Sequence, residues 1–375
     1  MSNEIILSNT DPDLPEEIRP GLTRYRNFRA MAKGGSGILQ AALDPVTGRT
    51  IAIKTLLPQL RKNRNECRRF LREARVTAQL QHPNTVPVYD IGDDPEQGLF
   101  FVMKRISGEN LFEVLKRIAR KDGPSVDAYP LSKRIEIVAD ACQALAYAHA
   151  RGVIHRDFKP ENIWVGNFGE VILLDWGVAK VWGHPDDNRP IDRSHLGEAP
   201  ALPDNSYAAS IIEQAKAMAA FRQPATETKP EVDDDQEQAE SESSGEDGSD
   251  TYGGDHLDLR TLTAAGQRPG TPLYMSPEQV DGSRGVDERS DVFSTGIVLY
   301  EAAAIREPFR GRTIDETFKK IRLENPQPPS VRAPEAGIPP ALDRVVMRCL
   351  EKDRSRRYPS MRSLIADLRD LEAEL

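Results

Sequence analysis

The stretch of sequence that decides the fold is His155-Arg156-Asp157-Phe158-Lys159-Pro160-Glu161-Asn162. An acid, an amine and an amide follow one another here at spacings of two and three, and the proline among them argues against a helix. Loops that are held by a rigid scaffold are where reactive side chains gather. The stretch therefore predicts a loop that presents Asp157, Lys159 and Asn162 to one site.

A second carboxylate follows this loop at the end of an apolar run. Asp175 lies thirteen residues after Asn162, in the sequence Leu173-Leu174-Asp175-Trp176-Gly177. Oxygen ligands such as this carboxylate and amide suit a hard cation that keeps some waters and shares the phosphates of a substrate. Asn162 and Asp175 are therefore predicted to hold Mg²⁺.

Glycines mark a possible phosphate loop near the start of the chain, in Ala32-Lys33-Gly34-Gly35-Ser36-Gly37-Ile38-Leu39. Small residues let backbone amides come close to anionic phosphates, and Lys54 on the next predicted strand places a cation within reach. Taken alone, the glycines fit a flexible hairpin better than a phosphate loop, and a lysine such as Lys54 is more often a solvated strand residue.

The pattern of apolar residues divides the chain into two parts. Short β-type runs alternate with turns from residue 25 to 106, with one helix near 64–80. Apolar residues then step by three and four along 131–149, and helical patterns resume near 291, after two strand-like runs around the turn at 166–169. A strand-rich lobe followed by a helix-rich lobe predicts an α+β fold.

The acidity of the chain is local. The 375 residues carry a net charge of −9, but residues 181–260 alone carry −13 and the remainder +4. Residues 231–250 are too polar to offset the entropy of ordering and are predicted to be disordered, whereas 209–221 could form a short docking helix. A net acidic chain is a poor general binder of polyanions, so nucleic acid is not expected as a partner.

Other features of the sequence exclude further classes of protein. The three cysteines show no CxxC spacing, which argues against a disulfide framework and a cysteine zinc site. Residues 1–20 show no signal-peptide pattern and are expected to form a loose tail. The most apolar segment, 297–305, is short and contains Glu301, so no membrane association is expected.

Together these motifs, in this chain order, resemble the protein kinases, specifically the eukaryotic-like Ser/Thr kinases of bacteria. The resemblance implies a two-lobe fold, with a first lobe at 21–104 and a second at 105–375 that is interrupted by an acidic insertion at 181–260. It implies ATP and Mg²⁺ as cofactors, Ser/Thr hydroxyls of proteins as acceptors, autophosphorylation, and a cytoplasmic location.

The resemblance also implies roles for individual residues. Lys54 would hold the α- and β-phosphates of ATP and pair with Glu73, with Glu66 as the weaker choice of partner. Asp157 would accept or orient the proton of the substrate hydroxyl, and Lys159 would steady the γ-phosphate. The remaining nucleotide contacts would come from Ala32, Gly34, Gly35, Gly37, Leu39, Ala52, Met103, Lys104 and Ile106, with Asn162 and Asp175 at the metal.

Structural roles follow from the same resemblance. Glu278, in Ser276-Pro277-Glu278, should pair with Arg357. Asp291 should fix the loop at 155–162, which corresponds to the catalytic loop of the family. Residues 271–278 resemble the element that docks the substrate peptide. His155 is expected to anchor the loop by hydrogen bonding and packing, without acting as an acid or a base.

The sequence departs from the family pattern at three points. Ala32 replaces the first glycine of the phosphate loop, which should at most weaken nucleotide affinity. Trp176 replaces the usual Phe and should resist being flipped outward. Glu278 follows Asp175 by 103 positions, where the family uses a few tens, but such lengthening costs only ~1 kcal/mol of loop-closure free energy.

Arg156 suggests control by phosphate, because an arginine in this position needs an anionic partner. Thr263 is the first candidate phosphosite and Thr261 the second. A basic face on the predicted helix suggests that the acidic insertion could lie against it and restrain Glu73, although a solvated surface explains the same charges. The basic residues are Arg61, Lys62, Arg64, Arg68, Arg69, Arg72 and Arg75.

Two other functions remain open at this point. A pseudokinase scaffold would bind partners through the insertion, but Lys54, Asp157, Asn162 and Asp175 are all retained. A small-molecule phosphotransferase is disfavoured by residues 271–278.

Overall fold

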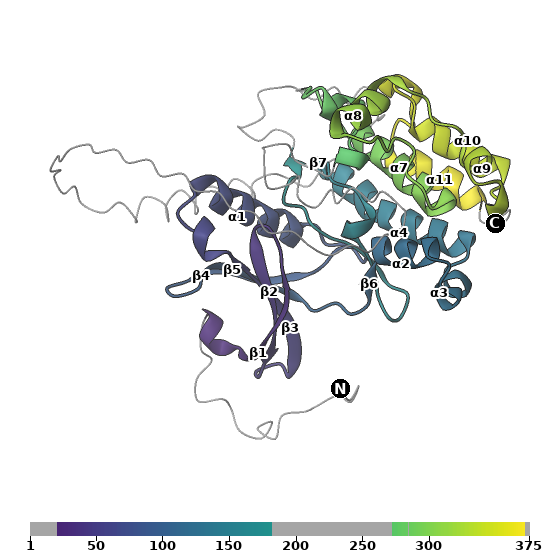
Figure 1. The fold of residues 1–375 in the computed structure, drawn as a ribbon. Helices are drawn as coiled ribbons and strands as arrows, with labels where there is room; N and C mark the ends of the chain where they lie inside the picture. The colour runs from purple at the N-terminus through teal and green to yellow at the C-terminus, as the bar shows by residue number, and fades with distance from the viewer. Residues whose placement is uncertain (1–20, 182–271, 284, 372–375) are drawn as a thin grey trace, which may run out of the picture. The chain divides into compact units, whose positions relative to one another are not determined.

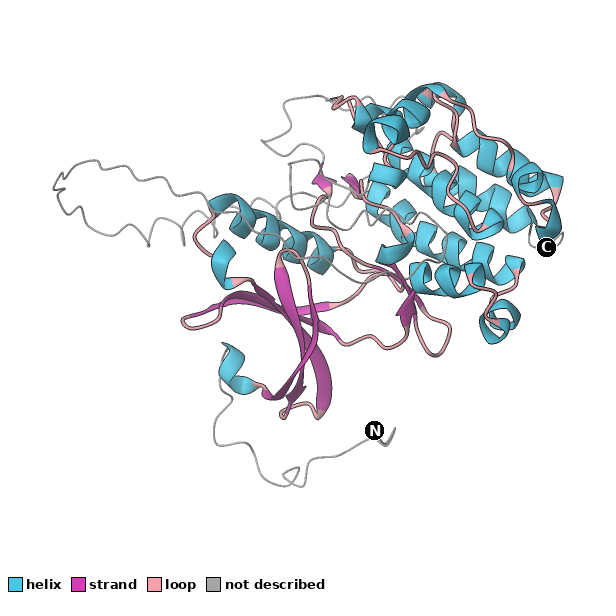
Figure 2. Ribbon diagram, viewed as in Figure 1, coloured by secondary structure: helices cyan, strands magenta, loops and turns pink. Residues whose placement is uncertain are grey.

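The computed structural model describes residues 21–181, 272–283 and 285–371. Within these ranges, strands dominate up to residue 104 and helices dominate after it, as Figure 2 shows. The predicted α+β fold is therefore confirmed. The expected tail at 1–20 and the insertion, from residue 182 onward, lie outside the described residues.

The first lobe is built on an antiparallel sheet with the strand order β1-β2-β3-β5-β4 (Figure 1). The strands are β1 Arg26–Lys33, β2 Gly37–Asp44, β3 Arg49–Leu56, β4 Val88–Asp94 and β5 Gly98–Lys104. Alternation along β3 buries Ile51 and Ile53 on one face against Phe100 and Val102. The opposite face of β3 carries Lys54.

Helix α1, Arg64–Gln79, covers this opposite face. Its first turn is capped by Asn63, whose side chain accepts hydrogen bonds from the amides of the second and third residues of the turn. Phe70 packs against Phe101 of the sheet, with ring centroids 5.2 Å apart, and Ala74 joins the same apolar cluster. This packing turns Glu73 of α1 toward the sheet and buries it.

The second lobe is mostly helical. Its helices are α2 Leu111–Ala119, α3 Gly123–Ala128, α4 Leu131–Ala150, α6 Pro277–Val280, α7 Arg289–Ala304, α8 Ile314–Leu323, α9 Pro329–Arg332, α10 Pro340–Cys349 and α11 Met361–Leu371. Helix α7 is buried on all sides and packs against α4, α10 and α11. No helix in the described ranges is long and apolar enough to span a bilayer.

Short strands position the predicted site. The strands are β6 Glu109–Asn110, β7 Val153–Ile154, β8 Ile163–Val165, β9 Val171–Leu173 and β10 Lys180–Val181. The loop at 155–162 leaves β7 and enters β8, and Asp175 lies two residues after the end of β9. Because Val181 pairs with Val153, the first residue assigned to the insertion belongs to this framework.

The two lobes are joined near this framework. Asn84, which precedes β4, accepts a hydrogen bond at its carbonyl from the amide of Leu173 at 2.8 Å. Its side chain donates to the carbonyl of Val171, also at 2.8 Å. Strand β9 is thereby tied to the first lobe immediately before Asp175.

Candidate active site

The loop between β7 and β8 holds its polar side chains together by its own contacts. The Lys159 ammonium lies 2.7 Å from the Asp157 carboxylate. The Asn162 amide nitrogen donates to the backbone carbonyl of Asp157 at 2.8 Å, so the amide oxygen is the atom left to face a ligand. Asp157 and Asn162 are both buried, so the loop presents its groups in a fixed arrangement.

Asp291 of α7 anchors the backbone of this loop by hydrogen bonds, as predicted. Its carboxylate accepts hydrogen bonds from the backbone amides of His155 at 2.9 Å and Arg156 at 2.8 Å. His149 of α4 contacts the same carboxylate at 2.7 Å. Burial alone would raise the pKa of Asp291, but these partners hold it below its ordinary value. Asp291 is therefore a buried anion that organises two segments.

His155 acts as an anchor in this arrangement. Its Nε2 lies 3.1 Å from the carbonyl of Leu174, and its Nδ1 accepts the amide of Asp157 at 3.2 Å. Its ring packs edge-on against Trp176 with centroids 4.6 Å apart. The expected anchoring role of His155 is confirmed as a set of contacts, because both ring nitrogens hold the backbone.

Lys54 and Glu73 form an ion pair between the sheet and α1. Burial opposes the charge on Lys54, but the nearby carboxylates of Glu73 and Asp175 raise the pKa of this ammonium. The alternative partner, Glu66, lies in the first turn of α1. The predicted choice of Glu73 is therefore confirmed as a contact.

Asp175 joins the two halves of the site. Burial opposes its charge, but Lys54, the amide of Gly177 and Lys159 together hold the pKa of this carboxyl below its ordinary value. A side chain at Gly177 would place its Cβ 3.0 Å from the Asp175 carboxylate and 3.4 Å from that of Glu73, which explains the glycine. Asp175 is thus an ionised group that shares one electrostatic environment with both lysines.

The residues expected to bind nucleotide share the face of the sheet that carries Lys54. Leu39 pairs with Lys54 across β2 and β3, and Ala32 pairs with Leu39 across β1 and β2. Ala52 pairs with Met103 across β3 and β5. Residues directly opposite each other in a sheet point to the same side, so these side chains form one surface.

The connections beside this surface are tight. A Cβ on Gly37 would lie 2.9 Å from the carbonyl of Thr55, so the loop can approach β3 only with glycine there. The amide of Gly34 bonds the Gly37 carbonyl at 2.9 Å, and Gly35 at the tip has open space around it. At the other end, the amide of Lys104 bonds Pro87, and Ile106 lies half-buried in the connection that follows β5.

The donor set suits a cation that is shared with a phosphate-bearing substrate. An ionised Asp175 and the amide oxygen of Asn162 are hard oxygen ligands. The described part of the chain contains no group of three or more His, Cys, Asp or Glu residues arranged to hold a metal ion. Phosphates and water would therefore have to complete the coordination of a cation at Asn162 and Asp175.

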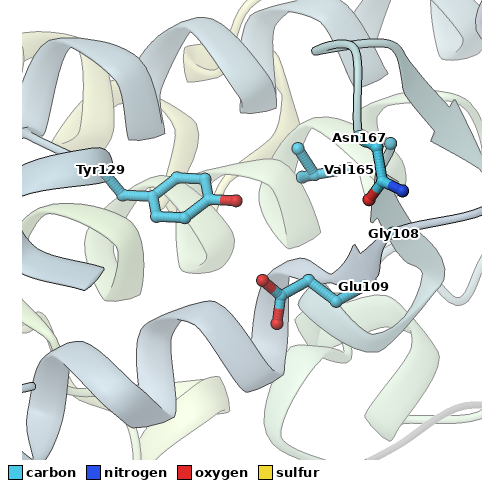
Figure 3. Close-up of a pocket in the computed structure, with 6 residues that line it drawn as sticks. Gly108, Glu109, Tyr129, Val165 and Asn167 are labelled. Carbon is cyan, nitrogen blue, oxygen red and sulfur yellow. The ribbon is translucent and has the colours of Figure 1, made fainter. Parts of the chain in front are cut away.

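A separate polar pocket of about 440 Å³ lies beside β6 and the turn between β8 and β9. Figure 3 shows Tyr129 and Glu109 projecting into it from different elements. The pocket is lined by Gly108, Glu109, Tyr129, Val165, Gly166 and Asn167. None of the predicted catalytic or nucleotide-binding residues belongs to this lining, so the pocket does not mark the predicted site.

Glu278 and Arg357 form the buried bridge that the sequence predicts. Two guanidinium nitrogens lie 2.8 and 3.0 Å from the two carboxylate oxygens. Ser290 donates to the same carboxylate at 2.6 Å, and the pKa of Glu278 is held low by Arg357 and Ser290 against the effect of burial. The Arg357 side chain is completely buried, so this bridge is part of the core.

A family model described as a protein kinase domain matches residues 25–197 and 258–367, which is more than half of the chain. The chain belongs to the protein kinase family. The two matched ranges leave residues 198–257 unmatched inside the kinase domain, within the insertion that the sequence predicts.

Two curated relatives that are similar to this kinase chain share one name. The chain is 30% identical to "Serine/threonine-protein kinase PknD" of Protochlamydia amoebophila (strain UWE25), over 92% of this chain and 29% of the relative. It is 32% identical to the protein of the same name in Chlamydia pneumoniae, over 92% of this chain and 31% of the relative. The chain therefore spans roughly three tenths of the length of these relatives.

Some contacts of the kinase site were not predicted. His149 is the last residue of the segment 131–149 that the sequence predicts as an apolar stripe, whereas the structure uses it to bond Asp291. The phosphosite candidates Thr261 and Thr263 lie outside the described residues. Arg156, to which an anionic partner was assigned, donates from Nε to the carbonyl of Val178 at 2.8 Å.

Proposed function

We propose that this protein transfers the γ-phosphate of ATP to Ser/Thr hydroxyls of proteins. The observation that carries the proposal is the convergence of Lys54, Lys159 and Asp175 in one electrostatic environment, between the nucleotide-binding face of the sheet and the loop of Asp157. Phosphoryl transfer depends mainly on positioning and charge stabilisation, and this set supplies both.

Each residue of the site would have a separate role in the reaction. Lys54, held by Glu73, would bind the α- and β-phosphates, while Lys159 would neutralise charge on the γ-phosphate. Asp157 would orient the acceptor hydroxyl and accept its proton. Asn162 and Asp175 would hold Mg²⁺, and the bound cation would supply positive charge that stabilises the negative charge developing on the phosphates.

The nucleotide would lie against the sheet. Ala32, Gly34, Gly35, Gly37 and Leu39 would cover the phosphates, because small residues allow close approach of backbone amides. The base would contact the remaining members of the same face and the connection between the lobes. Those members are Ala52, Met103, Lys104 and Ile106.

Autophosphorylation in the segment between Asp175 and Glu278, the activation segment of the family, would supply an anion for Arg156. We retain Thr263 as the first candidate site and Thr261 as the second. Phosphosite mapping after incubation with Mg²⁺ and ATP tests both residues, and modification elsewhere alone would remove them.

The test of the proposed function is labelling with γ-labelled ATP and Mg²⁺. Wild-type protein should label itself or a protein acceptor on Ser/Thr, and Lys54→Met should not. A pseudokinase would bind nucleotide without labelling anything. A small-molecule phosphotransferase would label a small acceptor in preference to protein, so both kinds of acceptor belong in the assay.

A further inference from the structure

The polar pocket beside β6 lies apart from the residues of the kinase site. Its volume of about 440 Å³ falls within the roughly 300–1,000 Å³ of small-molecule sites. The lining comes from the start of β6, the residue that follows α3, and the end of β8 with the turn after it. The side chains of Glu109, Tyr129 and Asn167 approach one space from these separate elements (Figure 3). A carboxylate, a phenol and an amide are thus offered to a single ligand.

The carboxylate in the lining is held in place before any ligand binds. Arg117 of α2 donates to both oxygens of Glu109, to one of them at 2.6 Å. The Nε atom of Arg117 donates to the Ser125 hydroxyl at 2.7 Å, and this hydroxyl donates to Asp122. Because its neighbours already fix the orientation of Glu109, a ligand would meet a preorganised wall and lose less entropy on binding.

The charges of the lining argue against an ionic ligand. An anion would be repelled by the Glu109 carboxylate, and the guanidinium nitrogens of Arg117 are engaged by Glu109 and Ser125. A cation would gain little, because Arg117 already compensates the charge of Glu109 at short range. The pocket therefore suits a neutral ligand.

Two polar side chains of the lining are available for hydrogen bonds. Neither the Tyr129 hydroxyl nor the Asn167 amide bonds any other residue within the described ranges. Burial and the charge of Glu109 raise the pKa of Tyr129, so its hydroxyl keeps the proton at neutral pH. A hydroxyl and an amide can each donate and accept. The hydroxyl groups of a ligand, which also do both, match them.

Apolar surface accompanies these polar groups. Val165 belongs to the lining and is buried. Phe168 directly follows Asn167 in the turn, and its side chain is 87% exposed. A cyclic polyol carries hydroxyls at its edge and C–H groups on its faces, so one molecule can pack against an aromatic ring while it bonds polar side chains.

We propose that Glu109, Tyr129 and Asn167 form a binding site for a neutral cyclic polyol of about the size of a monosaccharide, with Phe168 packed against its ring. The site shares no residue with the predicted nucleotide and metal sites. The inference goes beyond the proposed kinase activity and does not depend on it.

The test measures binding to the 375-residue protein by isothermal titration calorimetry without nucleotide. The polyol probes are glucose, N-acetylglucosamine and myo-inositol, and the ionic probes are arginine and inorganic phosphate. At least one polyol should bind with a Kd of roughly 1 mM or below. Cyclohexanol keeps a six-membered ring with a single hydroxyl, and it should bind at least tenfold more weakly, because hydroxyl-bonding groups left unpaired disfavour such an analogue.

Variants then assign the binding to this pocket. Tyr129→Phe removes the hydroxyl and keeps the ring, so the Kd of the polyol should rise about 3- to 10-fold, the size expected for one neutral hydrogen bond. The matched control is Tyr89→Phe, at an exposed position of β4, which should keep the wild-type Kd. Excess ATP with Mg²⁺ should not displace the polyol, because the two sites have separate linings.

Several outcomes would overturn the polyol site. No binding of any polyol up to about 50 mM, or tighter binding of arginine, phosphate or cyclohexanol, would reject the class of ligand. An unchanged Kd in Tyr129→Phe, or displacement by ATP, would place the polyol elsewhere on the protein. None of these results bears on the proposed kinase activity, because no phosphoryl transfer is measured.

Discussion

The carboxylate of Asp291, buried in α7, accepts the backbone amide of Arg156 in the catalytic loop at 2.8 Å. Arg156 has a φ of 66°, a left-handed conformation that is costly for a residue with a side chain. The hydrogen bond that the Arg156 amide donates to the buried anion holds this unfavourable backbone in place immediately before Asp157. The position of Asp157 therefore depends on a residue 134 positions away in the chain.

Substitution of this anchor should impair catalysis more than binding. In Asp291→Asn, one acceptor oxygen is lost and an amide donor replaces it, so the two loop amides can no longer both be satisfied. We expect kcat to fall roughly 10- to 100-fold, as for other partners that orient reactive groups, with KM for ATP unchanged. Steady-state kinetics on wild type and variant measure this split, and Asp315→Asn at an exposed position serves as control. Equal loss in kcat and in ATP affinity would indicate general unfolding of the loop.

Removal of the Asp157 carboxylate, which would accept the proton of the substrate hydroxyl, should slow phosphoryl transfer. Asp157→Asn keeps the shape of the side chain but cannot take a proton, so we expect a ~10²–10⁴-fold lower kcat. Nucleotide binding, measured by fluorescence titration with Mg²⁺ and ATP, should persist. A rate within twofold of wild type would show that Asp157 does not act on the hydroxyl.

The two glutamates of α1 offer a matched comparison. Glu73→Gln removes the charge that holds Lys54, and misplacement of a phosphate-binding group by ~1 Å can cost about 10²-fold in rate. Glu66→Gln changes the first turn of the same helix and should leave the rate unchanged. Initial rates of labelling compare the two variants, and equal effects would argue against the Lys54–Glu73 pair as part of the site.

The buried bridge between Glu278 and Arg357 should matter for stability. Arg357→Met leaves a buried carboxylate with one donor, and breaking such a pair costs about 3–5 kcal/mol. The control is Arg322→Met, whose partner Asp281 lies 3.6 Å away at an exposed position, where a pair contributes about 0–1 kcal/mol. Urea denaturation measures both, and similar losses for the two variants would contradict this ranking.

The buried carboxyl of Glu301 predicts a dependence of stability on pH. Its pKa is raised from an ordinary 4.5 to about 8 by burial and by Glu307, so the folded state retains a proton that the unfolded state releases. Its contribution to stability is therefore complete below pH 4.5 and is lost as pH rises toward 8. Glu301→Gln, which cannot titrate, should lose less stability than wild type across this range. Thermal denaturation at several pH values tests this, and parallel curves would refute it.

Much of this site could be predicted from the sequence, because its chemistry lies in short motifs. Asp157, Lys159 and Asn162 are neighbours in the chain, and Asp175 follows shortly after them, so spacing alone brings them together. Lys54 and Glu73 are nineteen residues apart, and their contact follows from the resemblance to known kinases.

Other relationships could not be predicted, because they depend on tertiary packing. Tyr274 and Glu301 are 27 residues apart, and nothing local in either segment indicates that the hydroxyl donates a hydrogen bond to the carboxylate. His149 follows the apolar period of α4, and only the approach of α7 reveals that it bonds Asp291. In both cases the partner is supplied by α7, whose buried position is visible only once the second lobe is assembled.

Trp176, the residue beside Asp175, carries two opposing effects. Its ring is fully buried against His155, and such burial of a large aromatic surface favours the inward position. Its indole N–H, however, has no hydrogen-bond partner in the described part of the molecule, which costs about 1–3 kcal/mol that phenylalanine would avoid. An outward rotation of Trp176 would hydrate the N–H but expose the ring. The unpaired N–H therefore lowers the free-energy difference between the inward and outward positions of the ring, whereas the buried aromatic surface raises it.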